Sequence, residues 1–141
     1  MIYPLDLREP AKRARCAAWL KVLRDRRLLT LSPQVLNETY WVVRRKPEFA
    51  PLRLGIRAYL QDYSRWTTAP LKSDTLADSF LIEDRFGARF WDALLLASAN
   101  AAGCDYFLSE DLNDGQSYGG VVVVNPFRHA PEDVLGAAPR P

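Results

Sequence analysis

The stretch FWDALLLASANAAGCDYFLSEDLNDGQSYGGVVVV, residues 90–124, decides the fold class. Residues 90–102 are mostly apolar and are followed by a glycine, which predicts a helix. Residues 104–108 then predict a strand, and the Asn-Asp-Gly sequence at residues 113–115 marks a turn. Four consecutive valines at residues 121–124 predict a strand that is buried on both faces. A helix followed by buried strands is typical of an α/β fold.

The residues before this stretch show the same alternation of helical and strand patterns. Proline and glycine residues separate the segments, and apolar residues recur at helical spacing in the longer ones. The predicted helices cover residues 10–27, 33–46, 48–65 and 73–86, and the predicted short strands cover residues 28–31 and 67–70. Such alternation predicts a mostly parallel sheet with helices on both faces, whose functional site lies beyond the carboxyl ends of the strands.

Size and composition are those of an ordinary globular protein. The chain has 141 residues, of which 48% are hydrophobic and 26% are charged, as in one soluble domain. It shows neither an apolar run of the roughly 18 residues that cross a bilayer nor a basic leader before an apolar segment. We therefore expect a cytoplasmic protein without a membrane partner. Its domain covers residues 1–127, and residues 128–141 form a Pro/Ala-rich tail that is loose beyond one turn near residues 131–135.

Charge is distributed unevenly along the chain, although the formal net charge is only +2. Residues 1–46 carry 11 Lys or Arg and 4 Asp or Glu, a net charge of +7, whereas residues 47–141 carry 8 and 13, a net charge of −5. This asymmetry suggests a surface for a polyanion beside an acidic centre, although a basic helix is also common as a solvated face. The candidate RNA-binding residues are Lys12, Arg13, Lys21, Arg24, Arg44, Arg45 and Lys46.

Three carboxylates occupy positions where an acidic residue is unexpected. Glu38 and Asp92 each share a helix face with apolar residues, so both are expected to point inward. Asp111 follows the strand at residues 104–108, at the end where a site is expected. Each also has a structural interpretation: Asp92 favours a helix N-terminus, Asp111 suits a turn, and Glu38 extends into solvent. In combination they predict a site for Mg²⁺ or Mn²⁺, which take oxygen ligands and activate water.

Other kinds of catalytic site are less compatible with this composition. The single histidine, His129, follows the last predicted strand, and neither Cys16 nor Cys104 belongs to a CxxC pair. These features argue against a triad hydrolase and against a His-rich zinc site.

Four patches of the sequence resemble the PIN-domain family, in the family's order and spacing. FWDALLLA at residues 90–97 resembles the family's FWDALIxAAA helix, and AGCDYFLSEDLNDG at residues 102–115 resembles the segment that follows it. GVVVVNPF at residues 120–127 resembles the closing element, and LSPQVLNE at residues 31–38 resembles the second element. The resemblance extends over residues 3–127.

This resemblance implies a three-layer α/β/α sandwich with a mostly parallel sheet and an acidic pocket that binds Mg²⁺ or Mn²⁺. The family's metal-binding carboxylates fall on Glu38, Asp92 and Asp111, with Ser109 as a supporting hydroxyl and Asp114 as an additional acid. The family's activity is hydrolysis of RNA phosphodiester bonds, and its VapC-like members are toxins of type II toxin–antitoxin pairs.

The family pattern also contains a first strand that is absent or truncated in this sequence. That strand is central in the family's sheet and ends in the aspartate that is the first metal ligand. The stub Met1-Ile2-Tyr3 resembles the residues just after it, whereas Asp6 resembles a loop acid further downstream and is not assigned the ligand role. Two explanations stay open: a start codon assigned too late, which the otherwise intact pattern favours, or a decayed, inactive copy.

The sequence therefore predicts a metal-dependent endoribonuclease, whose basic rim holds the RNA backbone while the carboxylates hold the metal ion. The alternative is a catalytically inactive PIN-like module that binds RNA or an antitoxin. The expected partners are RNA, a cognate antitoxin whose arginine approaches the carboxylates, and a second copy of the chain, since PIN toxins commonly dimerise.

Overall fold

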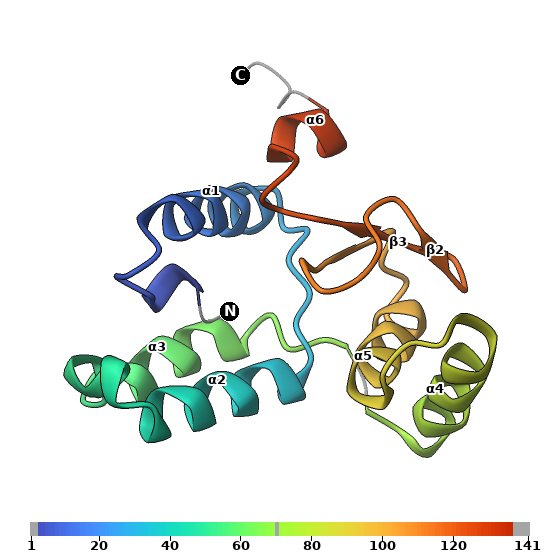
Figure 1. Ribbon diagram of the computed structural model, residues 1–141, viewed down its shortest axis with the longest axis horizontal. Helices are drawn as coiled ribbons and strands as arrows, with labels where there is room; N and C mark the ends of the chain where they lie inside the picture. The colour runs from blue at the N-terminus through green and yellow to red at the C-terminus, as the bar shows by residue number, and fades with distance from the viewer. Residues whose placement is uncertain (1–2, 70, 137–141) are drawn as a thin grey trace.

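In residues 3–69 and 71–136, which the computed structural model describes, helices dominate and three short strands form one small sheet (Figure 1). In chain order the elements are η1 (Tyr3–Leu5), α1 (Pro10–Asp25), α2 (Pro33–Arg45), η2 (Pro47–Leu52), α3 (Ile56–Ser64), α4 (Ser73–Phe86), α5 (Phe90–Ala101), β1 (Tyr106–Leu108), β2 (Ser117–Tyr118), β3 (Val121–Val124) and α6 (Pro131–Leu135), where η marks a 3₁₀ helix. The predicted mixed α/β class is confirmed. No helix in these residues is long and apolar enough to cross a membrane.

The sheet has the strand order β1–β3–β2, so β3 lies in the middle. β1 runs parallel to β3, with Phe107 opposite Val123, and β2 runs antiparallel to β3. The turn between β2 and β3 requires glycine, because Gly119 has a φ of +68° and a Cβ there would lie 3.0 Å from Nδ2 of Asn100. That amide donates a hydrogen bond of 2.9 Å to the carbonyl of Tyr118, which fastens the hairpin to α5.

The sheet differs from the expected one in its strand directions. It is mixed rather than mostly parallel, since one of its two strand pairs is antiparallel. The sequence does not predict β2, because two residues are too few to show an alternating pattern. Residues 104–108 were expected as one strand, and only Tyr106–Leu108 pair with β3.

The strand predicted at residues 28–31 is reduced to a single parallel bridge between Leu31 and Thr67. The reason lies in the backbone hydrogen bonds. The N–H groups of Leu28 and Leu29 both donate to the carbonyl of Leu23 at the end of α1, so they are not available to a strand partner. The predicted edge strand at residues 67–70 contributes only the other half of this bridge, and residue 70 lies outside the described residues.

The helix predicted over residues 48–65 is two elements, η2 and α3. Pro51 has no N–H to donate and so favours the short 3₁₀ segment. Gly55, which has low helix propensity, then precedes the first residue of α3. The helices predicted over residues 33–46, 73–86 and 90–102 are confirmed to within one residue at each end.

The apolar interior is divided into three clusters. The largest joins α4 and α5 to the sheet and contains Leu96, Ala97, Val121 and Val123, each at most 1% exposed. A second cluster surrounds Leu29, Leu31 and Tyr63, and a third surrounds Val43, Phe49 and Ile56 between α2, η2 and α3. The sheet is therefore covered by the α4–α5 pair, which also positions the loop that follows β1 (Figure 1).

The segment after β3 packs against α1 as far as residue 136. The indole N–H of Trp19 donates to the carbonyl of His129 at 3.1 Å, and Arg26 donates to the carbonyls of Leu135 and Gly136. The single turn expected near residues 131–135 is present as α6. The rest of the predicted tail, residues 137–141, lies outside the described residues.

Candidate functional site

Asp92 and Asp111 line the same cavity, a hollow of about 190 Å³ between the α4–α5 connection and the loop after β1. Asp92 is the third residue of α5, and Asp111 lies three residues beyond the end of β1. The other lining residues are Phe86, Gly87, Ala88, Arg89, Leu112, Asn113 and Tyr118. The two segments meet because α5 and the sheet share one apolar cluster, as their sequence patterns predict.

Asp92 is the more enclosed of the two carboxylates, with 20% of its side chain exposed. The Nε of Arg89 donates to its Oδ2 at 2.9 Å, and the N-terminus of α5 adds a favourable field. Arg89 is itself 74% exposed, so solvent weakens this ion pair. Arg89 was missed by the sequence analysis, although its spacing of three residues from Asp92 is the signal that identifies such a pair.

Asp111 is exposed at the mouth of the cavity. Its own N–H donates to the Oγ of Ser109 at 3.2 Å, so Ser109 shapes the backbone of this loop. The neighbouring Glu110 points the other way. It accepts hydrogen bonds from the hydroxyl of Tyr3 and, at 2.7 Å, from Nζ of Lys12.

Asp114, expected as an additional metal-binding acid, is held by the protein at both of its oxygens. Oδ1 accepts the N–H of Asn125 at 2.8 Å, and Oδ2 lies 2.8 Å from Nε2 of His129. The hydrogen bond from Asn125 and the contact with His129 lower the pKa of Asp114. These contacts fasten the loop to the end of β3, which is a structural role.

The prediction that Glu38 points inward is wrong, because this side chain is exposed on α2. The buried positions of α2 are Gln34, Thr39 and Val43, and Glu38 lies next to them on the helix without being buried itself. The Oε1 of Glu38 accepts a hydrogen bond from the side-chain amide of Gln34 at 2.8 Å. The two flanking valines, Val35 and Val42, are themselves only half-buried, so their spacing did not make Glu38 a buried position.

The expected site of three carboxylates is not assembled. Within residues 3–69 and 71–136, no group of three or more His, Cys, Asp or Glu side chains is placed to hold a metal ion. The structure brings Asp92 and Asp111 to one cavity and leaves Glu38 and Asp114 outside it. Two carboxylates with nearby amide and phenol groups suit a hard cation such as Mg²⁺ or Mn²⁺, although Arg89 already occupies one oxygen of Asp92.

The basic residues expected to bind RNA fall into two groups. Those of α1 have partners: Lys12 pairs with Glu110, Lys21 pairs with Asp25, Arg13 donates to a backbone carbonyl and Arg24 stacks against Tyr63 and Trp66. Those at the end of α2 are exposed, namely Arg44, Arg45 and Lys46. Among the candidate residues, the exposed bases without an acidic or backbone partner in the described chain are therefore those at the end of α2.

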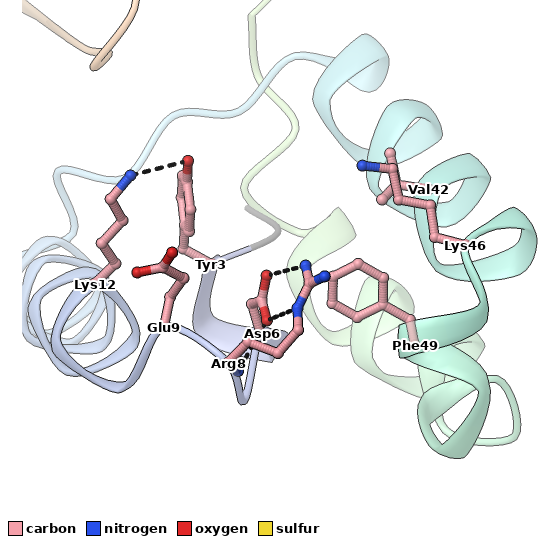
Figure 2. Close-up of a pocket in the computed structure, with 8 residues that line it drawn as sticks. All are labelled: Tyr3, Asp6, Arg8, Glu9, Lys12, Val42, Lys46 and Phe49. Atoms are coloured by element: carbon pink, nitrogen blue, oxygen red, sulfur yellow. Dashed lines mark hydrogen bonds and ion pairs between the residues drawn. The ribbon is translucent and has the colours of Figure 1, made fainter.

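A larger cavity of about 550 Å³ lies between the N-terminal segment and the end of α2 (Figure 2). Arg8 crosses it, pairing with Asp6 at 2.7 Å and with Glu48 at 3.0 Å, and its guanidinium lies over the ring of Phe49. The hydrogen bonds from Arg8 hold the pKa of Asp6 at about 2. No pattern in the sequence predicts this cavity. Within it Arg8 neutralises Asp6, and Asp6 belongs to no group of three possible metal ligands in the described chain.

Comparison with known proteins adds no family to this description. No family model matches the sequence, and a search of curated proteins finds no match.

Proposed function

We propose that this protein is a Mg²⁺- or Mn²⁺-dependent endoribonuclease, the toxin of a type II toxin–antitoxin pair, with a PIN-like three-layer α/β/α arrangement. The observation that carries the proposal is that Asp92 and Asp111, two acids that the family resemblance assigns to metal binding, line one cavity at the carboxyl end of β1. The exposed bases of α2 supply the positive surface that an RNA backbone requires.

In this proposal Asp92 and Asp111 hold the metal ion. The ion would lower the pKa of water and offset charge on the scissile phosphate. Arg89 has a second part in the chemistry. It neutralises Asp92 while the site lacks a cation, and its exposed side chain is free to turn toward a phosphate once a metal ion takes its place. Asn113 lines the cavity too; its side-chain N–H donates to Gln116 at 2.7 Å, which leaves its side-chain carbonyl oxygen for the cation or the substrate.

The test is cleavage of RNA in the presence of Mn²⁺ or Mg²⁺ by the wild type and by Asp92→Asn and Asp111→Asn. Asp105→Asn is the matched control, because Asp105 is an exposed acid at the opposite end of β1 that does not line the cavity. We expect both cavity variants to lose at least 100-fold in rate, about 2.7 kcal/mol, and the control to retain full activity. The assignment is refuted if Asp92→Asn and Asp111→Asn cleave RNA as fast as the wild type and Asp105→Asn.

The second candidate function is a catalytically inactive module that binds RNA or an antitoxin. Two observations favour it. Arg89 already pairs with Asp92, and Glu38 is exposed, so the cavity has only two carboxylates where the family pattern requires more. Retained RNA binding without any metal-dependent cleavage, in the wild type and in all variants, would identify this function. A cognate antitoxin and a second copy of the chain are partners under either proposal.

A further inference from the structure

Trp41 is an exposed indole on the surface of α2. It is 58% exposed, whereas Trp19 in α1 is 2% exposed and belongs to the buried core. The guanidinium of Arg45 lies 4.1 Å from the centre of its ring, which is the closest of the cation–π contacts in the described chain. An indole held by an arginine and left open to solvent is poorly explained by packing alone.

The surroundings of Trp41 are polar and positively charged. Helix geometry makes Asn37, Glu38, Arg44 and Arg45 its neighbours three and four residues away, and all four are exposed. Neither Arg44 nor Arg45 has an ion-pair partner within the described residues, and Glu38 already accepts a hydrogen bond from Gln34. Two uncompensated guanidinium groups therefore flank a flat aromatic surface.

Trp91 provides a useful contrast within the same chain. It is 63% exposed on α5, and its ring contacts that of Phe90, which in turn contacts Phe80. Phe80, on α4, is itself 47% exposed. Trp91 thus belongs to an apolar patch that suits a protein partner, whereas Trp41 has charged neighbours that suit a polyanion.

We propose that Trp41, Arg44 and Arg45 form a binding platform for single-stranded RNA, on which one base stacks against the indole while the two arginines contact the adjacent phosphates. Aromatic side chains accept any base by stacking, and arginines beside them hold the backbone. The identity of the ligand as RNA rests on the proposed function. The platform itself rests on the exposure, the stacking contact and the charge around Trp41.

The experiment measures the affinity of the full chain for a fluorescently labelled, single-stranded RNA oligonucleotide in EDTA, so that no cleavage occurs. Trp41→Leu removes the aromatic face, Trp41→Phe retains one, and Trp91→Leu is the matched control for loss of an exposed tryptophan. We expect Trp41→Leu to weaken binding about 5- to 150-fold, the range for one stacked base. Trp41→Phe should retain most of the affinity, and Trp91→Leu should match the wild type.

A second oligonucleotide of the same length but with abasic residues separates stacking from charge. Wild type and Trp41→Leu should bind it equally, because it has no base to stack, whereas Arg44→Gln should weaken binding to both oligonucleotides. The proposal is overturned if Trp41→Leu binds the normal oligonucleotide as tightly as the wild type, or if Trp41→Phe is as weak as Trp41→Leu. Binding of a protein partner at Trp41 in place of RNA would give the first of these results.

The outcome is independent of the nuclease assay. Loss of RNA affinity in Trp41→Leu, with no metal-dependent cleavage by any variant, would support the platform and refute the nuclease. Unchanged affinity in Trp41→Leu, with cleavage abolished by Asp92→Asn, would refute the platform and support the nuclease. Because Trp41 is exposed, each variant should melt within a few degrees of the wild type, and a thermal scan checks this.

Discussion

Arg89 competes with any metal ion for Asp92, and its removal should therefore strengthen metal binding. The perturbation is Arg89→Gln, which keeps a polar side chain and removes the charge. The only contact that the structure gives this guanidinium within the described residues is the 2.9 Å hydrogen bond and ion pair with Oδ2 of Asp92.

The magnitude follows from the exposure of the two partners. Because Arg89 is 74% exposed and Asp92 is 20% exposed, the pair belongs with solvent-screened surface ion pairs, which contribute about 0.3 to 1 kcal/mol. A metal ion must displace this contact, so its removal should tighten Mn²⁺ binding by about two- to fivefold. The stability of the metal-free protein should hardly change, because an arginine at the N-terminus of α5 opposes the helix dipole.

The assay is a calorimetric titration of Mn²⁺ into wild type, Arg89→Gln and a matched control, Arg65→Gln. Arg65 forms an ion pair of the same spacing with Asp62 at the end of α3 and does not line the cavity. Tighter binding in Arg89→Gln alone is the expected result. If Arg89→Gln binds Mn²⁺ no more tightly than the wild type, or if Arg65→Gln shows the same gain, the competition between Arg89 and the metal is not real.

Three further predictions concern the core, the N-terminal cavity and α2. Leu96→Ala, at a fully buried position between α5 and the sheet, should lower the free energy of unfolding by about 2 to 5 kcal/mol in urea melts, whereas Leu54→Ala at a 98% exposed position should stay within about 0.5 kcal/mol. Asp6→Asn should lower the free energy of unfolding at neutral pH, because Arg8 depresses the folded-state pKa of Asp6 from 3.8 to about 2. The difference in unfolding free energy from wild type should shrink as the pH falls from 4 to 2. A difference that persists at pH 2 would contradict the ion pair. Glu38→Gln should leave the Mn²⁺ affinity unchanged, since Glu38 is exposed and outside the cavity; abolished binding would show that Glu38 is a ligand after all.

The helices with clear sequence boundaries were predictable. Ser32 and Pro33 begin α2, and Gly87 ends α4 with a φ of +65°, so each boundary is fixed by local backbone chemistry. The four valines of β3 were predictable for a similar reason, since only a buried strand accommodates such a run.

The sheet and the exposure of Glu38 were not predictable from local patterns. Strand formation at residues 28–31 depends on a partner, and the N–H groups of Leu28 and Leu29 turn back to α1 instead. Glu38 was misplaced because Val35 and Val42 suggested a buried face, whereas both valines are only half-buried and Glu38 is exposed. Burial of polar residues is decided by tertiary contacts, which a sequence pattern does not contain.

The candidate site was predictable in part, because two of its residues lie at element ends. Asp92 and Asp111 were identified from their positions at the start of a helix and after a strand, and a shared cavity is what those positions imply. Arg89 and the cavity around Arg8 depend on side-chain pairs across or near element ends, and such pairs follow from the folded structure more than from a sequence pattern.

The most direct test of the metal site is the position at which Mn²⁺ binds in solution. Paramagnetic Mn²⁺ broadens the backbone amide signals of nearby residues, so a titration at low Mn²⁺ followed by two-dimensional NMR locates the ion without reference to activity. We expect residues 87–93 and 111–113 to broaden first, and the amides around Glu38 and around Asp6 to keep their intensity. Broadening that begins on α2 or in the cavity around Arg8, or that spreads evenly over the chain, would contradict this expectation.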